Sequence, residues 1–96
     1  MDHFQRQGPT LHCEDVNLHH VAQRFGTPTY VYSKATITRH IKVLQEALTD
    51  LPHHICYAVK ANGNLSILEL IQELGCGFDA VSVGELKRVE HIGADP

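Results

Sequence analysis

The stretch Cys56-Tyr57-Ala58-Val59-Lys60-Ala61-Asn62 decides the fold of this 96-residue chain. It places Lys60 at the end of a short apolar run that favours a strand, and a turn and a helical pattern follow at once. A strand that ends in a lysine and turns into a helix holds the amine at the mouth of a parallel sheet or barrel, where α/β folds place their chemistry. Because Val59 and Ala61 flank it, we expect the amine to be partly desolvated, which favours the neutral, nucleophilic form. Such an amine can form a Schiff base with an aldehyde.

The two faces of this strand differ in the size of their side chains. Side chains alternate along a strand, so Ala58 and Lys60 share one face while Tyr57 and Val59 share the other. If Lys60 points into the mouth of a barrel, the small Ala58 lies beneath it and leaves room for a flat ring. Tyr57 and Val59 then pack outward against helices.

Strands and helices alternate on both sides of this stretch, which predicts βαβ units and a parallel sheet. Each expected helix follows a residue that can cap its N-terminus and carries an apolar stripe. We expect strands at residues 10–13, 29–32, 55–60 and 78–81, and helices at residues 17–26, 33–50, 64–75 and 82–92.

Composition excludes several classes of function. The net charge of −3 provides no basic surface, so we expect no nucleic-acid partner. The three cysteines, Cys13, Cys56 and Cys76, include no Cys-x-x-Cys pair and are typical of a reducing cytoplasm. No apolar run has the length of a signal peptide or a membrane span. The histidine pairs His19-His20 and His53-His54 lack the spacing of a zinc site, so we expect no metal.

Three motifs carry a resemblance to a known family. They are Phe25-Gly-Thr-Pro-Thr-Tyr-Val-Tyr-Ser33, Tyr57-Ala-Val-Lys-Ala-Asn-Gly-Asn64 and Gly75-Cys-Gly-Phe-Asp-Ala-Val-Ser-Val-Gly-Glu-Leu86. They resemble the fold-type III decarboxylases that depend on pyridoxal 5'-phosphate (PLP), and among these the diaminopimelate decarboxylases. The resemblance implies an α/β fold, the N-terminal part of a PLP-binding (β/α)8 TIM-type barrel like that of alanine racemase. Residues 1–28 would precede the barrel and residues 29–96 would form part of it. A complete barrel takes roughly 250 residues, so we expect a truncated, N-terminal fragment.

The resemblance also implies roles for individual residues. Lys60 would be the catalytic residue that holds PLP, with Ala58, Asp79 and Glu85 beside the cofactor. Asp79 also fits a turn aspartate with no chemical role. Glu85 also fits a capping box with Ser82, which explains both residues without chemistry.

The full-length parent would be a carboxy-lyase that converts meso-2,6-diaminopimelate to L-lysine and CO2, a homodimer in the cytoplasm. Two alternatives remain open: an ornithine, arginine or carboxynorspermidine decarboxylase of the same family, and a non-catalytic PLP-binding homologue. We expect the residues that bind the phosphate and the substrate to lie beyond Pro96, so the sequence leaves the exact substrate undecided. We expect the fragment alone to be inactive.

Overall fold

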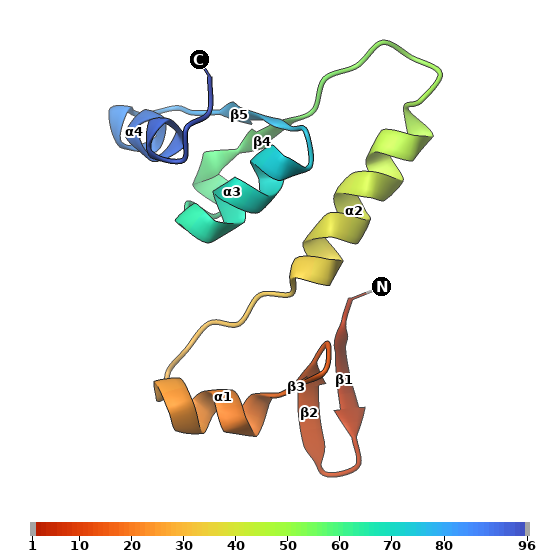
Figure 1. Ribbon diagram of the computed structural model, residues 1–96, viewed down its shortest axis with the longest axis vertical. Helices are drawn as coiled ribbons and strands as arrows, with labels where there is room; N and C mark the ends of the chain where they lie inside the picture. The colour runs from red at the N-terminus through yellow and green to blue at the C-terminus, as the bar shows by residue number, and fades with distance from the viewer. Residues whose placement is uncertain (1, 96) are drawn as a thin grey trace. The chain divides into compact units, whose positions relative to one another are not determined.

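The computed structural model describes residues 2–95 and divides the chain into two compact units, Met1–His40 and Ile41–Pro96 (Figure 1). The first unit contains a three-stranded antiparallel sheet in which successive strands are neighbours, followed by a helix. Of its strands, only the one at residues 10–13 was predicted; of the other two, one is largely polar and one has only two residues. The elements are β1 (Phe4–Gln7), β2 (Thr10–Cys13), β3 (Val16–Asn17) and α1 (Leu18–Phe25).

Both helices that begin in this unit start at the caps that the sequence predicts. The Asn17 side chain accepts a hydrogen bond of 2.8 Å from the His19 N–H at the start of α1, and Gly26 ends that helix at a φ of 82°. The Ser33 hydroxyl oxygen accepts a hydrogen bond of 3.1 Å from the Thr36 N–H at the start of α2 (Lys34–Ala47). Each cap satisfies N–H groups that have no partner within the helix.

A carboxylate supports the second of these caps. Glu14 Oε2 accepts hydrogen bonds from the Ser33 hydroxyl at 2.8 Å and from the Ala35 N–H at 3.2 Å. The Ser33 hydroxyl, followed by the Ala35 N–H, lowers the pKa of Glu14 below its ordinary value. The stabilisation from this contact is therefore fully present above the pKa of unfolded Glu14 and is lost as the pH falls through the lowered folded pKa.

The prediction of a strand at residues 29–32 is wrong. This segment has no regular structure, and Tyr30 is 88% exposed while Tyr32 is 49% exposed. The two rings stack on each other with their centroids 6.4 Å apart. A strand requires a hydrogen-bonded neighbour, and none of the strands in residues 2–95 pairs with this segment.

The second unit contains one parallel βαβ motif and a following helix, as the alternation in the sequence predicts. Both strands are shorter than predicted, because the paired residues run only from Cys56 opposite Gly77 to Ala58 opposite Asp79. The elements are β4 (Cys56–Ala58), the 3-10 turn η1 (Val59–Ala61), α3 (Leu65–Glu73), β5 (Gly77–Asp79) and α4 (Val83–His91).

The core of this unit joins the sheet to both helices. Val59, Leu68 and Val89 are buried together, and Tyr57 and Phe78 pack against them. Leu68 is fully buried, at 0% exposure. The prediction that Tyr57 and Val59 face the helices is therefore confirmed. So is the apolar stripe of α3, whose buried residues are Ile67, Leu68 and Ile71.

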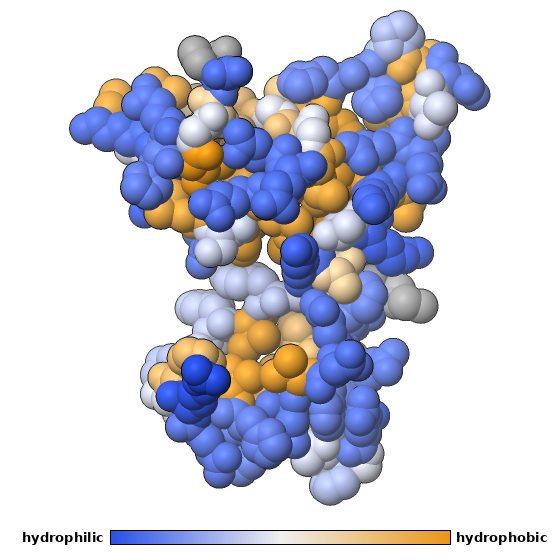
Figure 2. Space-filling view, in the orientation of Figure 1, coloured by the Kyte–Doolittle hydropathy of each residue, from blue (hydrophilic) through white to orange (hydrophobic). Residues whose placement is uncertain are grey.

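Apolar surface remains outside this core. Figure 2 shows orange, hydrophobic side chains interspersed with blue ones across the surface. In the second unit, Val81 and Val83 are 65% and 69% exposed, and Leu44 and Leu86 are close to half exposed. Within residues 2–95, no helix combines the length and the apolar character that crossing a membrane requires.

Candidate functional site

Lys60 is the middle residue of η1, which begins immediately after β4. This corrects the expectation that it belongs to the strand. Ala58 opposite Asp79 is the last pair of the ladder, and the chain then turns so that Val59 enters the core. The amine is still at the carboxyl end of a parallel strand, as predicted. Lys60 and Ala61 are both exposed, so these residues do not form the desolvated surroundings that we expected.

The turn that carries Lys60 is held on both sides. On one side, Val59 is 2% exposed and is buried with Leu68 and Val89. On the other side, the Tyr57 hydroxyl donates a hydrogen bond of 3.1 Å to the Asn62 carbonyl oxygen. The backbone around Lys60 is therefore fixed, while the Lys60 side chain lies outside the core and is exposed.

The loop after this turn is fixed by side chains. Asn62 Oδ1 accepts a hydrogen bond of 3.0 Å from the Asn64 N–H. Asn64 Oδ1 accepts hydrogen bonds from the N–H groups of Ser66 and Ile67 at 2.9 and 3.4 Å, and so caps α3 as predicted. The side chains of Asn62 and Asn64 therefore order the segment between η1 and α3.

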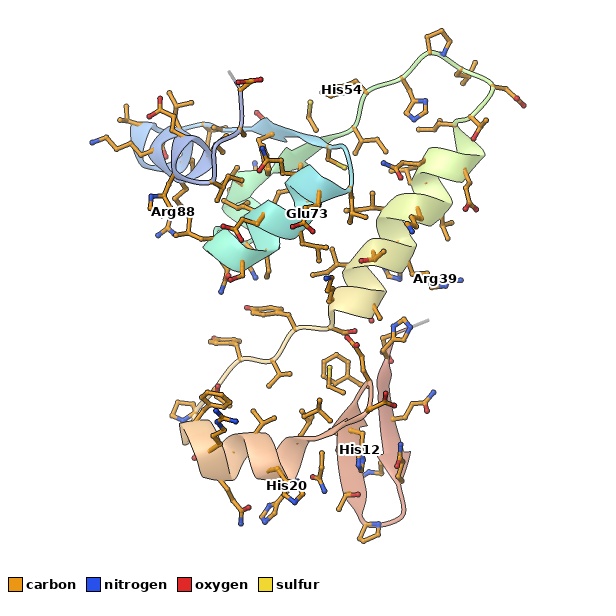
Figure 3. The ribbon with its side chains drawn as sticks, in the orientation of Figure 1. His12, His20, Arg39, His54, Glu73 and Arg88 are labelled. Atoms are coloured by element: carbon orange, nitrogen blue, oxygen red, sulfur yellow. The ribbon has the colours of Figure 1, made fainter. Side chains whose placement is uncertain are left out.

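A residue that the sequence did not single out also holds this loop. Arg88 Nη1, from α4, donates a hydrogen bond of 3.0 Å to the carbonyl oxygen of Gly63, and Figure 3 labels Arg88 on that helix. The two residues are 25 positions apart. No local pattern relates them, and the sequence therefore carries no signal for this contact.

The sheet face opposite the core carries small side chains at its carboxyl end. Paired residues of a parallel sheet share a face, so Ala58 and Asp79 lie together on the face away from Tyr57 and Phe78. Cys56 and Gly77 share this face at its amino end, where the His54 imidazole lies close over Gly77. Asp79, at the carboxyl end, is exposed. Only small side chains and one carboxylate therefore occupy this face at its carboxyl end, and a flat ring can approach it.

The structure assigns Glu85 to the cap of α4. The Ser82 hydroxyl oxygen accepts a hydrogen bond of 3.2 Å from the Glu85 N–H, and the same hydroxyl contacts Glu85 Oε2 at 3.3 Å. Glu85 Oε1 accepts a hydrogen bond of 3.2 Å from the Val81 N–H. The predicted capping box is confirmed, although the carboxylate binds the N–H one residue before the cap.

The helix N-termini at this end already have partners. The Asn64 and Ser82 side chains accept hydrogen bonds from N–H groups in the first turns of α3 and α4. A helix N-terminus binds an anion through such N–H groups when they are free. The caps therefore occupy the N–H groups of Ser66, Ile67 and Glu85.

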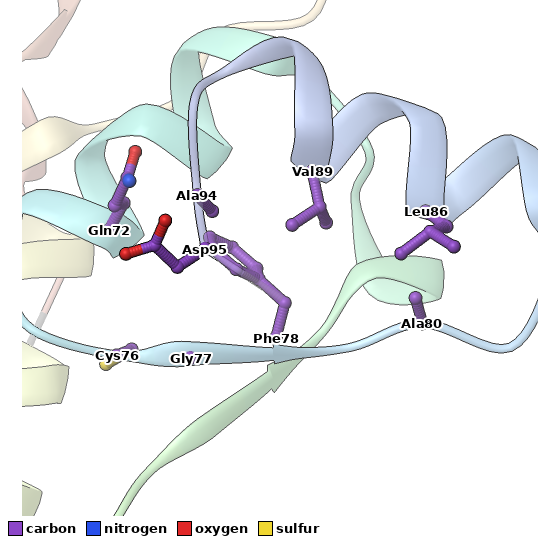
Figure 4. Close-up of a pocket in the computed structure, with 9 residues that line it drawn as sticks. All are labelled: Gln72, Cys76, Gly77, Phe78, Ala80, Leu86, Val89, Ala94 and Asp95. Atoms are coloured by element: carbon purple, nitrogen blue, oxygen red, sulfur yellow. The ribbon is translucent and has the colours of Figure 1, made fainter.

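The structure also contains a hollow that is separate from the predicted site residues. Its volume is about 430 Å³, and it lies on the helix side of β5 (Figure 4). Phe78, Leu86 and Val89 line much of it. Lys60 and the three residues predicted beside it are absent from its lining. We therefore interpret it as a packing hollow between β5 and α4.

The histidines and cysteines do not gather at this site. His12, His20 and His54 lie on separate segments in Figure 3, and residues 2–95 contain no group of three or more metal-ligating side chains. All three cysteines are free. Burial raises the pKa values of the Cys13 and Cys76 thiols, which disfavours the reactive thiolate.

Comparisons with known proteins agree on one family. Residues 34–96 match the model of the pyridoxal-dependent decarboxylases, at their pyridoxal binding domain. The chain is 50% identical over 96 residues to a diaminopimelate decarboxylase of Pseudomonas aeruginosa and 52% identical over 97 residues to that of Vibrio cholerae. Each match covers 100% of the chain and 23% of the relative.

Solved structures show the same relationship. A crystal structure from Aquifex aeolicus matches 98% of the chain with a TM-score of 0.90 and 41% identity. The diaminopimelate decarboxylase of M. jannaschii, solved in complex with L-lysine, matches 97% of the chain with a TM-score of 0.81 and 31% identity. The chain covers 23% of each of these proteins. It therefore has the fold of this part of the decarboxylase barrel.

Proposed function

Because the chain belongs to the family of pyridoxal-dependent decarboxylases, we propose that it supplies the Lys60-bearing segment of a diaminopimelate decarboxylase. In this proposal, the full-length enzyme removes CO2 from meso-2,6-diaminopimelate and leaves L-lysine. Here the full-length enzyme means a decarboxylase of the relatives' length in which residues 1–96 occupy the matching segment.

One observation carries the proposal: Lys60 is an exposed amine on a turn that is fixed directly after β4. The residues around it fit PLP. Ala58 leaves the carboxyl end of this sheet face free of bulky side chains, and Asp79 adds a carboxylate to the same end. These residues provide no phosphate site, so the phosphate requires donors from the rest of the enzyme.

Each residue then has a distinct task. Lys60 is the point at which the cofactor is covalently attached, and Ala58 leaves space for its ring. The Asp79 carboxylate places a negative charge at the carboxyl end of the same sheet face, and Glu85 holds the start of α4 at the catalytic end. When bound, PLP supplies the electron sink for the electron pair that remains after CO2 departs.

The substrate test compares several amino acids. CO2 release is measured for the full-length enzyme with meso-diaminopimelate, ornithine, arginine and carboxynorspermidine. We expect release from meso-diaminopimelate alone. Preference for one of the other three substrates would assign the enzyme to another member of the family. PLP binding without CO2 release from any substrate would support the non-catalytic homologue.

Three further expectations belong to this proposal. Residues 1–28 precede the barrel and residues 29–96 form part of it, although the structure divides the chain near residue 40. The full-length enzyme is a homodimer in the cytoplasm that binds no nucleic acid and no membrane. Light scattering on the purified full-length enzyme measures its oligomeric state, and cell fractionation measures its location.

Asp79→Asn is expected to lower the turnover of the full-length enzyme by about tenfold with little change in melting temperature. The amide keeps the size of the side chain and removes the charge that acts on the lysine. Because Asp79 is exposed, the substitution should alter the unfolding free energy by only about 0.5 kcal/mol or less. Steady-state kinetics and thermal melting measure the two effects. Glu90→Gln, at an exposed position on α4, is the matched control. Unchanged turnover would assign Asp79 to structure.

A further inference from the structure

We propose that Arg88 is a positioning residue for Lys60: its guanidinium holds the loop at residues 62–64 against α4 and so fixes the turn that carries the reactive amine. This inference rests on the proposed function, because it concerns how Lys60 is presented to PLP. Arg88 acts through the backbone and needs no contact with the cofactor.

The hydrogen bond of Arg88 lies close to Lys60 along the chain. Arg88 Nη1 donates to the Gly63 carbonyl oxygen at 3.0 Å, three residues after Lys60. The neighbouring residue of the helix, Val89, is buried with Val59, which directly precedes Lys60. Two successive residues of α4 therefore hold the chain on the two sides of Lys60.

Arg88 also approaches Gly63 closely. A Cβ atom added to Gly63 would lie 3.3 Å from Arg88 Cδ and 3.5 Å from Nε. The aliphatic stem and the guanidinium therefore cover the Cα of this glycine as well as bonding its carbonyl oxygen. A Cβ at Gly63 therefore requires the arginine side chain to move by a few tenths of an ångström.

The contact also couples the two strands of the sheet. The loop at residues 62–64 follows β4, whereas α4 follows β5, which carries Asp79. A shift of α4 that loosens the contact would therefore alter the position of Lys60 relative to Asp79. Displacements of about 1 Å in a reacting group can cost roughly 100-fold in rate.

The test measures how fast Lys60 is modified by PLP in the full-length apoenzyme. PLP is added, samples are trapped with borohydride at successive times, and mass spectrometry counts the modified Lys60 peptide. Arg88→Gln removes the charge and most of the contact, and we expect trapping to slow by about tenfold in the folded fraction. Arg88→Lys keeps one charged donor and should recover part of the rate. Lys87→Gln removes one charge from a neighbouring exposed position and should leave the rate unchanged.

Gly63→Ala provides a second, independent variant. It keeps Arg88 and requires the arginine side chain to move by only a few tenths of an ångström, so trapping should slow less than in Arg88→Gln. Trapping at the unaltered rate in Arg88→Gln would overturn the inference, as would equal slowing by Lys87→Gln or stronger slowing by Gly63→Ala than by Arg88→Gln. If the unaltered enzyme gave no adduct at Lys60, the proposed function itself would fail, and the inference with it.

Discussion

Replacing Lys60 with alanine is expected to abolish the borohydride-stable attachment of PLP to the full-length enzyme. CO2 release should fall by at least roughly 1,000-fold. The reason is geometric: Lys60 is the one lysine of residues 2–95 that directly follows a parallel strand, since Lys34, Lys42 and Lys87 lie on helices. Lys60→Arg should fail as well, because a guanidinium stays charged and is not a nucleophile at neutral pH.

Absorbance of the bound cofactor before and after borohydride treatment measures this attachment, and peptide mass spectrometry locates it. Lys87→Ala is the control, since it removes an exposed lysine from α4 and should leave the adduct intact. A reducible PLP adduct that persists in Lys60→Ala would show that another amine holds the cofactor.

The 96-residue chain by itself is expected to melt without a cooperative transition and to release no CO2 from diaminopimelate. The parallel sheet of residues 2–95 has only two strands, so each strand has an unpaired edge. Val81, Val83 and Tyr30 are all at least 65% exposed. Each large apolar side chain left in water forfeits about 1.5–3 kcal/mol of burial, so three such losses are comparable with the lower part of the usual stability of about 5–15 kcal/mol.

Calorimetry and circular dichroism on the isolated chain measure this directly, with the full-length enzyme as the cooperative reference. Size-exclusion chromatography should show association through the exposed apolar surface. A monodisperse chain with a sharp thermal transition would show that these 96 residues form an independent domain.

The helix starts could be predicted because a cap is a local interaction. Asn17, Ser33, Asn64 and Ser82 each bond an N–H group two or three residues further along the chain. Such contacts depend on spacing that can be read from the sequence, and the structure confirms all four. The motif around Lys60 identified the family for a similar reason, since its residues are contiguous.

The strands were predicted less well because a strand depends on a partner that is distant in sequence. The segment at residues 29–32 has a suitable composition but no neighbouring strand in residues 2–95. The polar segment Phe4–Gln7 forms β1 because Phe4 and Gln7 pair with Cys13 and Thr10. Pairing therefore outweighed intrinsic preference in both cases.

The sequence by itself determined the alternation of strands and helices, the caps, and the family to which the motif around Lys60 belongs. Only the tertiary structure decided that Lys60 lies on a 3-10 turn, that Asp79 pairs with Ala58, and that Arg88 holds Gly63. The physical reason is the range of the interactions. Caps and helix stripes act between residues a few positions apart, whereas the site is assembled by contacts across 21 residues of the sheet, from Ala58 to Asp79, and 25 residues between Gly63 and Arg88. These contacts form only when the chain is folded.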